Sequence, residues 1–173
     1  LKNLPSPDQC LQLLIQMGCS EEVISHCKAV RDVALRIARK AGANEELVEV
    51  GALLHDIGRS KTHGIQHAVE GAKIARSLGL PEPLVNIIER HIGAGLTRDV
   101  AKKLGLPSNN FMPVTLEEKI VCHADNLINN NKRQYIEVEI ERALREGNKE
   151  YAKRLVIIHK ELSEICGIDV NKI

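Results

Sequence analysis

Amphipathic segments with a helical period follow one another along this 173-residue chain, and this pattern limits the fold more than any other feature. Each segment carries apolar residues at spacings of three and four, and Gly, Pro or Asn separates it from the next. We see no segment with the period of two that predicts a strand. The expected helices lie at about 7–18, 21–41, 45–58, 66–78, 81–91, 97–104, 115–128, 135–146 and 149–166. We therefore predict an all-α, single-domain bundle of about seven to nine helices.

Several helix boundaries carry capping signals. Ser20 is a plausible N-cap for the second helix, and Asn44 precedes two glutamates in the first turn of the third. The run from Thr115 to Glu118 matches a capping box, and three asparagines at 129–131 break the helix that follows it.

The composition excludes several classes of partner. Hydrophobic residues make up 43% of the chain but aromatic residues only 2%, so Leu, Ile, Val and Ala must build the core. Proteins that bind single-stranded nucleic acid use aromatic platforms, which are scarce here. A formal net charge of +1 shows no basic excess for nucleic acid or a membrane surface. Nucleic acid and membrane partners are therefore not expected.

Five cysteines form no C-x-x-C pair, and their number is odd. We find neither a signal peptide nor an apolar run of about 18–20 residues that a membrane span would need. These features predict a cytoplasmic protein with reduced thiols, without a zinc–thiolate site.

Polar groups interrupt the apolar stripes at specific positions. His26 lies on the stripe of Val30 and Val33, and the pair His55-Asp56 ends an apolar helix. Asp125 lies among Val121, Ala124 and Ile128 on a face that should be buried. A lone buried carboxylate is unfavourable unless a cation or hydrogen bonds compensate it.

Two more histidines follow the same pattern. His67 shares a stripe with Gly71 and Ile74, and His91 follows Ile87 and Ile88. Any one of these histidines alone is more often a structural core residue than a ligand. Six such groups on five stripes together predict a shared metal site, since imidazole and carboxylate ligands suit Mn, Fe, Co, Ni or Zn, with Mg as a further option.

The string Ala52-Leu53-Leu54-His55-Asp56-Ile57-Gly58 resembles the signature of the HD-domain phosphohydrolase superfamily in its HDIG variant. The family pattern is a histidine, a later His-Asp pair and a distant aspartate, which here are His26, His55-Asp56 and Asp125. The resemblance covers about residues 20–130 and implies an HD-domain helical bundle. We treat 1–173 as a single HD domain in which 131–173 form a C-terminal helical extension.

His67 and His91 resemble the extra histidines of HD subfamilies that hold two metals, among them HD-GYP cyclic-dinucleotide phosphodiesterases and di-iron diadenosine tetraphosphate hydrolases. In such enzymes the HD aspartate bridges the metals, which gives that role to Asp56. His91 is followed by Ile92-Gly93-Ala94 rather than Gly-Tyr-Pro, which counts against cyclic-di-GMP hydrolysis. The chain also resembles small stand-alone HDIG proteins of archaea.

The resemblance implies a metal-dependent phosphohydrolase that cleaves a phosphodiester or phosphoanhydride of a nucleotide-type substrate with metal-activated water. The expected cofactor is a divalent transition metal, two ions per chain. The expected metal ligands are His26, His55, Asp56, His67, His91 and Asp125.

His55, Asp56, Arg59 and Lys61 are the catalytic candidates, and Arg59, Lys61, Lys132 and Arg133 are the substrate-binding candidates. We expect the insert 97–113 to shape the substrate pocket. His63 is either a leaving-group acid or a surface residue, while His123 and His159 are expected to be structural.

Two alternatives stay open at this point. One is a mononuclear nucleotide phosphomonoesterase that uses the four core ligands alone, and the other is a noncatalytic metal- or nucleotide-binding module. The expected partner is a small phosphorylated or nucleotide substrate. The last two helices either pack on the core or form the face of a homo-oligomer.

Overall fold

Nine α-helices make up most of the part of the chain that the structure, a computed structural model, describes: residues 3–173. This number and the all-α class confirm the prediction. The helices are α1 Pro7–Gln16, α2 Glu21–Ala41, α3 Glu45–Leu54, α4 His67–Ser77, α5 Glu82–Glu89, α6 Arg98–Lys103, α7 Leu116–Asn126, α8 Ile136–Arg145 and α9 Lys149–Cys166, with 3-10 turns η1 Ile57–Ser60 and η2 Val170–Lys172.

The helix starts follow the capping signals. The Ser20 hydroxyl accepts a hydrogen bond from the Val23 amide at 3.2 Å, and the Thr115 hydroxyl accepts one from the Glu118 amide at 3.2 Å. The reciprocal half of the capping box is missing, however. The Glu118 carboxylate lies 2.9 Å from Arg90 and accepts instead from the Val114 amide, one residue before the cap. The ion pair with Arg90 therefore joins α7 to the end of α5.

Two helix ends differ from the prediction. The third expected helix stops at Leu54 rather than near 58, and the 3-10 turn η1 follows, so His55 and Asp56 lie at the break between the two. The helix expected up to about 128 stops at Asn126. There a short antiparallel hairpin, β1 Ile128–Asn129 and β2 Lys132–Arg133, replaces the expected break, with Asn130 at φ +57°. The sequence shows no strand period here, because strands of two residues are too short to have one.

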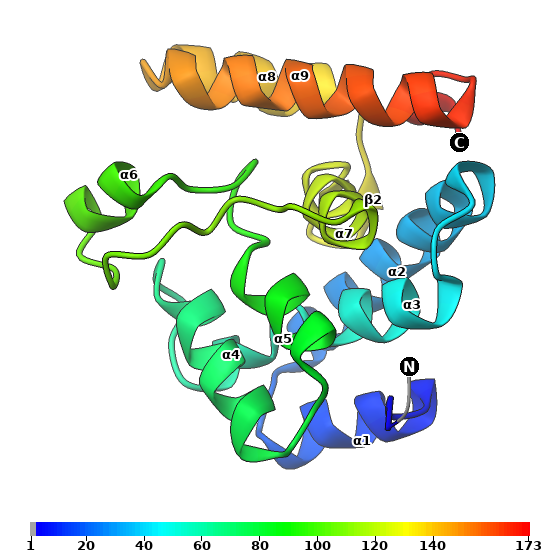
Figure 1. Ribbon diagram of the computed structural model, residues 1–173, viewed down its shortest axis with the longest axis vertical. Helices are drawn as coiled ribbons and strands as arrows, with labels where there is room; N and C mark the ends of the chain where they lie inside the picture. Colours follow the sequence, from blue (N-terminus) through cyan, green and yellow to red (C-terminus); the bar gives the residue numbers. More distant parts are fainter. Residues whose placement is uncertain (1–2) are drawn as a thin grey trace.

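The helices are arranged in a central group with a separate layer at one end (Figure 1). In the central group α2 packs against α3 and α7, while α4 packs against η1 and α5. The helices α8 and α9 pack against each other and lie across the end of the molecule opposite α1 (Figure 1), with α9 also contacting α2 and α7. The C-terminal extension thus packs on the core.

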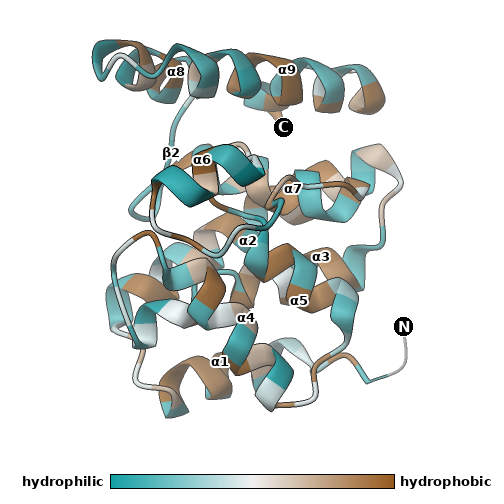
Figure 2. Ribbon diagram, turned by 60° about the vertical axis from the view of Figure 1, so that its left-hand side comes forward, coloured by the Kyte–Doolittle hydropathy of each residue, from teal (hydrophilic) through white to brown (hydrophobic). Residues whose placement is uncertain are grey.

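The core consists almost wholly of aliphatic side chains, as the composition predicts. Leu53, Leu54, Ile87, Ile88 and Ile120 are among its largest fully buried members. Figure 2 shows apolar stretches on α3, α5 and α7, whereas polar residues dominate α6 and α8. The insert has a small core of its own, formed by Leu96, Ala101, Leu106 and Phe111. It holds α6 beside the central group.

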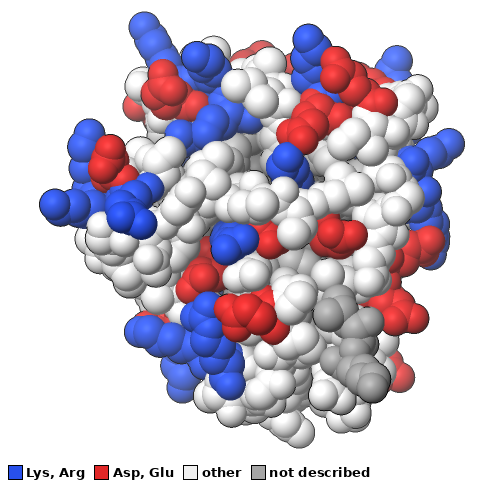
Figure 3. Space-filling view, viewed as in Figure 1, with Lys and Arg blue, Asp and Glu red and all other residues white. Residues whose placement is uncertain are grey.

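The surface charge on the face shown in Figure 3 is mixed, as the net charge of +1 leads one to expect. On this face, Lys and Arg side chains alternate with Asp and Glu side chains in small groups of both signs (Figure 3). Among the described residues, no helix is long and apolar enough to cross a membrane.

Candidate metal centre

Six side chains from five parts of the chain meet between the central helices. His26 comes from α2, His67 from the first position of α4, and Asp125 from the last turn of α7. His55 and Asp56 lie at the break after α3, and His91 directly follows α5. Because most of these residues stand at helix ends, their side chains can converge without interrupting a helix.

Gly58 allows the turn after Asp56 to approach α4. A Cβ atom at this position would lie 1.7 Å from the His67 carbonyl oxygen and 2.6 Å from the Gly71 amide nitrogen. Both neighbours are backbone atoms, so only glycine fits. This close approach brings the turn that carries Asp56 next to the helix start that carries His67.

Backbone carbonyl groups fix the tautomer of all four histidines. The Nδ1 atoms of His26, His55, His67 and His91 lie 2.5, 2.7, 2.8 and 2.6 Å from the carbonyl oxygens of Asn130, Ala52, Gly64 and Ile88, respectively. A carbonyl only accepts, so each Nδ1 carries the proton and donates it. In the neutral ring the lone pair is then on Nε2, as in metal-ligating histidines whose other nitrogen is held by an outer partner.

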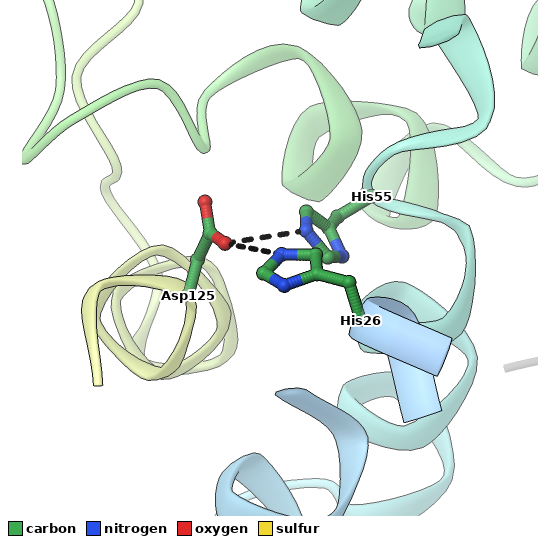
Figure 4. A group of neighbouring side chains, drawn as sticks. All are labelled: His26, His55 and Asp125. Atoms are coloured by element: carbon green, nitrogen blue, oxygen red, sulfur yellow. Dashed lines mark hydrogen bonds and ion pairs between the residues drawn. The ribbon is translucent and has the colours of Figure 1, made fainter. Parts of the chain in front are cut away.

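The Nε2 atoms of His26 and His55 form one group beside Asp125. Its Oδ1 lies 2.8 Å from His26 Nε2 and 3.5 Å from His55 Nε2. Figure 4 shows the two imidazoles turned toward this one oxygen from separate segments. The Asp56 Oδ2 atom lies close to the same pair, 3.7 Å from His55 Nε2 and 3.9 Å from His26 Nε2.

The second group surrounds the other oxygen of Asp56. Its Oδ1 lies 3.2 Å from His67 Nε2 and 3.3 Å from His91 Nε2, and these two nitrogens are 3.0 Å apart. The two carboxylate oxygens of Asp56 are therefore divided between two pairs of imidazoles.

The charge state of these groups suits a cation. Burial alone would raise the pKa of Asp56, but His55, His67 and His91 outweigh it and hold this pKa well below its usual range. Burial would likewise raise the pKa of Asp125, but His55 and His26 outweigh it and hold this pKa well below its usual range. Burial also lowers the pKa of His91 and so favours its neutral ring. For His55, by contrast, Asp56 and Asp125 outweigh burial and raise the pKa well above its usual range, so the two anionic carboxylates favour positive charge between them.

Two atoms of the cluster make no well-formed hydrogen bond, although Asp56 Oδ1 lies close to two imidazole nitrogens. His55 Nε2 and Asp56 Oδ1 are buried and make no hydrogen bond to the residues that the structure describes. Buried polar atoms without a partner are rare in folded proteins, and a bound ion can satisfy them. The residues present therefore fit divalent metal ions in both their chemistry and their unsatisfied atoms.

Arg59 contacts the cluster directly. Its Nε donates to Asp56 Oδ2 at 2.8 Å, and its Nη1 donates to the His63 carbonyl oxygen at 3.3 Å. The guanidinium group lines two cavities on either side of the cluster. The larger, of about 860 Å³, is also lined by His26, Asp56 and His63.

The smaller cavity has a volume of about 430 Å³ and includes His67, His91 and Asp125 in its lining. Val100 and Leu104 of the insert line it too, so the insert contributes to a cavity beside the cluster. Sequence reasoning missed its far wall, which contains Arg142, Tyr151 and Arg154 from α8 and α9. Tyr151 lies three and four residues before Arg154 and the buried Leu155, and this helical spacing is a signal that Tyr151 and Arg154 face inward.

The remaining cationic candidates lie elsewhere. Lys61 and Lys132 are exposed, and neither lines the two cavities that flank the cluster. The Arg133 guanidinium donates to the carbonyl oxygens of Val170 and Asn171 at 2.7 and 3.3 Å. The structure thus brings Arg59 to the cluster but not the other three, because the hairpin turns Arg133 toward the C-terminal segment.

His123 and His159 contact each other rather than the cluster. His123 Nε2 lies 2.8 Å from His159 Nδ1, and His159 Nε2 lies 2.8 Å from Asp169 Oδ1. Burial and the neighbouring His159 lower the pKa of His123 to about 3. The two rings link α7 to α9.

The family model of the HD domain matches residues 23–130, more than half of the chain. The HD domain of the L. monocytogenes phosphodiesterase PgpH, solved in complex with cyclic-di-AMP, is similar in fold with a TM-score of 0.60 at 18% identity, over 91% of this chain and 95% of that one.

Two relatives are more similar in sequence. A tRNA (cytidine(56)-2'-O)-methyltransferase of Thermoplasma volcanium is 44% identical over 173 residues, all of this chain but 51% of that protein. An uncharacterized protein of Methanocaldococcus jannaschii is 47% identical over 154 residues, 85% of this chain and 91% of that protein. The chain therefore spans about half the length of the methyltransferase it matches.

Proposed function

The chain belongs to the HD domain family, and we propose that it is a metal-dependent phosphohydrolase. In this proposal it cleaves a phosphodiester or phosphoanhydride bond of a nucleotide-type substrate. The observation that supports this best is the division of the two Asp56 oxygens between two pairs of imidazoles. A carboxylate placed in this way suits a bridge between two metal ions.

His26, His55, Asp56 and Asp125 would hold the first ion, and His67, His91 and Asp56 the second. Divalent cations at these positions would acidify water and neutralise charge on the phosphoryl group. The four Nδ1–H bonds to carbonyl oxygens hold the imidazoles in place before any ion binds.

Arg59 would bind a non-bridging oxygen of the phosphate. Asp56 and the His63 carbonyl occupy its Nε and Nη1, which fixes the guanidinium plane beside the cluster. Its Nη2 has no acceptor among residues 3–173 and is free to donate to a ligand. A guanidinium group held in this way binds phosphate with little loss of side-chain entropy.

The comparisons favour a ribonucleotide compound as the substrate. The T. volcanium relative is named for tRNA, and the L. monocytogenes domain binds cyclic-di-AMP. Methyl transfer is not part of our proposal, because the methyltransferase is about twice as long as the stretch it shares with this chain. The cluster, moreover, consists of the side-chain types that hydrolytic metal sites use as ligands.

The test combines metal content with activity. The protein would be loaded with Mn²⁺ or Fe²⁺, its metal counted per chain, and its activity measured on bis(p-nitrophenyl) phosphate and p-nitrophenyl phosphate. Two metals with diester cleavage support the proposal. One metal with monoester cleavage indicates the mononuclear phosphomonoesterase, and full loading without turnover on a broad nucleotide panel indicates a noncatalytic binding module.

Asp56→Ala is the decisive variant, because it removes a ligand from both groups. We expect it to lose metal and to lower diester cleavage by more than the ~10–100-fold that removal of an outer-shell partner costs. Asp8→Ala is the matched control, since Asp8 is exposed on α1 and lines neither cavity beside the cluster. An Asp56→Ala protein that keeps both metal and activity would contradict the site assignment.

A further inference from the structure

The cavity of about 430 Å³ beside His67 and His91 has features that the metal cluster does not explain. Its volume lies within the ~300–1,000 Å³ of small-molecule sites. The metal-ligand candidates form one end of it, and side chains of α8 and α9 form another part of its wall. A substrate bound at the cluster can extend into this space.

Arg154 of α9 lines this cavity without a carboxylate partner. No ion pair joins it to any residue in the range 3–173, and its Nε is buried and makes no hydrogen bond there. The residue as a whole is only half-buried, but a buried N–H group without an acceptor is unfavourable. The Arg154 Nε is therefore a donor whose acceptor is absent from the described chain.

Arg142 lies in the same wall and, unlike Arg154, forms ion pairs with neighbouring carboxylates. Its guanidinium contacts Glu139 at 2.5 Å and Glu146 at 2.8 Å, the first on its own helix and the second directly after it. These two carboxylates also line the cavity, so Arg142 neutralises them. A further carboxylate in the lining, Glu150, is exposed and forms no ion pair with Arg154 within residues 3–173, so Arg154 is a cation available to a ligand.

Tyr151, one turn before Arg154, is held rigidly. Its hydroxyl oxygen lies 2.8 Å from Glu139 Oε1 and 3.1 Å from Asn126 Oδ1, next to Asp125 in the chain. Its ring lies 3.7 Å from the position that a Cβ on Gly93 would take. The turn of α9 that carries Arg154 is thus fixed against both α7 and the loop after His91.

The opposite side of the cavity is apolar. Ile65, Ile92, Leu96, Val100 and Leu104 line it, and several of them pack against the small core of the insert. A cavity with an apolar side, one unpaired arginine and a metal-ligand cluster has the features of a nucleotide site. The apolar side suits the base or sugar, and the arginine suits an anionic group.

We propose that Arg154 binds a second, non-reacting phosphate group of the substrate, so that the substrate carries at least two phosphates. This inference rests on the proposed function, in which the reacting phosphate binds at the histidine–aspartate cluster. Guanidinium groups bind phosphate through two parallel hydrogen bonds, which gives both affinity and orientation.

The test measures binding, so it does not depend on turnover. Adenosine 3′,5′-bisphosphate and adenosine 5′-monophosphate would be titrated into Mn²⁺-loaded protein by calorimetry. We expect the wild type to bind the bisphosphate more tightly. Arg154→Gln should weaken bisphosphate binding by roughly 10- to 100-fold, the range for a lost charged hydrogen bond, and leave the monophosphate almost unchanged.

Two further variants keep the test specific. Lys153→Gln removes the same charge from an exposed neighbour on α9 and should leave both affinities unchanged. Arg154→Lys should restore part of the preference for the bisphosphate, and circular dichroism would verify that each variant folds.

Three outcomes would overturn the inference: no preference of the wild type for the bisphosphate, equal preference in Arg154→Gln, or an equal loss for both ligands. Failure to hydrolyse any diester, with the binding preference intact, would count only against the proposed function.

Discussion

The family core, residues 23–130, and the C-terminal helices α8 and α9 contribute differently to the same site. The core supplies all six metal-ligand candidates, together with Arg59. The C-terminal helices supply none of these, but Tyr151 and Arg154 line the cavity beside them. In the proposed function, the residues that would cleave the bond and the residue that would bind the rest of the substrate therefore lie in different segments of the chain.

The largest expected difference between the two regions is in the tolerance of glycine to substitution. Gly58→Ala should lower the free energy of unfolding by more than about 3 kcal/mol, because its Cβ meets two backbone atoms that cannot move independently. Gly147→Ala, between α8 and α9, should cost only about 1–2 kcal/mol, since φ is +77° but nothing lies within 4 Å. Urea denaturation measures both. Equal losses would show that the contact of η1 with α4 is not a tight one.

A smaller effect is expected where the two regions meet. His159→Gln disturbs the contacts of His159 with His123 and Asp169, and should lower stability by about 1 kcal/mol without changing the metal content. Thermal unfolding and metal analysis would be compared with those of Lys160→Gln, an exposed neighbour. Loss of metal from the His159 variant would mean that the link to α9 also positions Asp125.

Much of the core could be predicted from the sequence, because its signals are local. Ser20 and Thr115 cap their helices as expected, and His26 and His91 point inward from apolar stripes. The pair His55-Asp56 belongs to a short motif, 52–58, whose residues are all direct neighbours in the sequence. Local patterns of this kind depend on a few adjacent residues, so they can be read without knowing the fold.

The parts of the site that could not be predicted from the sequence depend on contacts between distant segments. Lys132 and Arg133 follow Asp125 closely in sequence, but a two-residue hairpin directs Arg133 to the carbonyl oxygens of Val170 and Asn171. Arg154 lies far from the motif in sequence and still reaches the cavity, because α9 packs across α7. No periodicity shows which helix faces which, and this left the far wall of the cavity unpredicted.

The sharpest test of the proposed two-ion site is the number of metal ions that the protein binds with and without the second pair of imidazoles. The double variant His67→Ala/His91→Ala leaves the groups around Asp125 in place. We predict that the wild type binds two ions per chain and that this variant binds one, with the fold verified by circular dichroism. A wild type that binds one ion, or a variant that still binds two, would contradict a site divided by the two oxygens of Asp56.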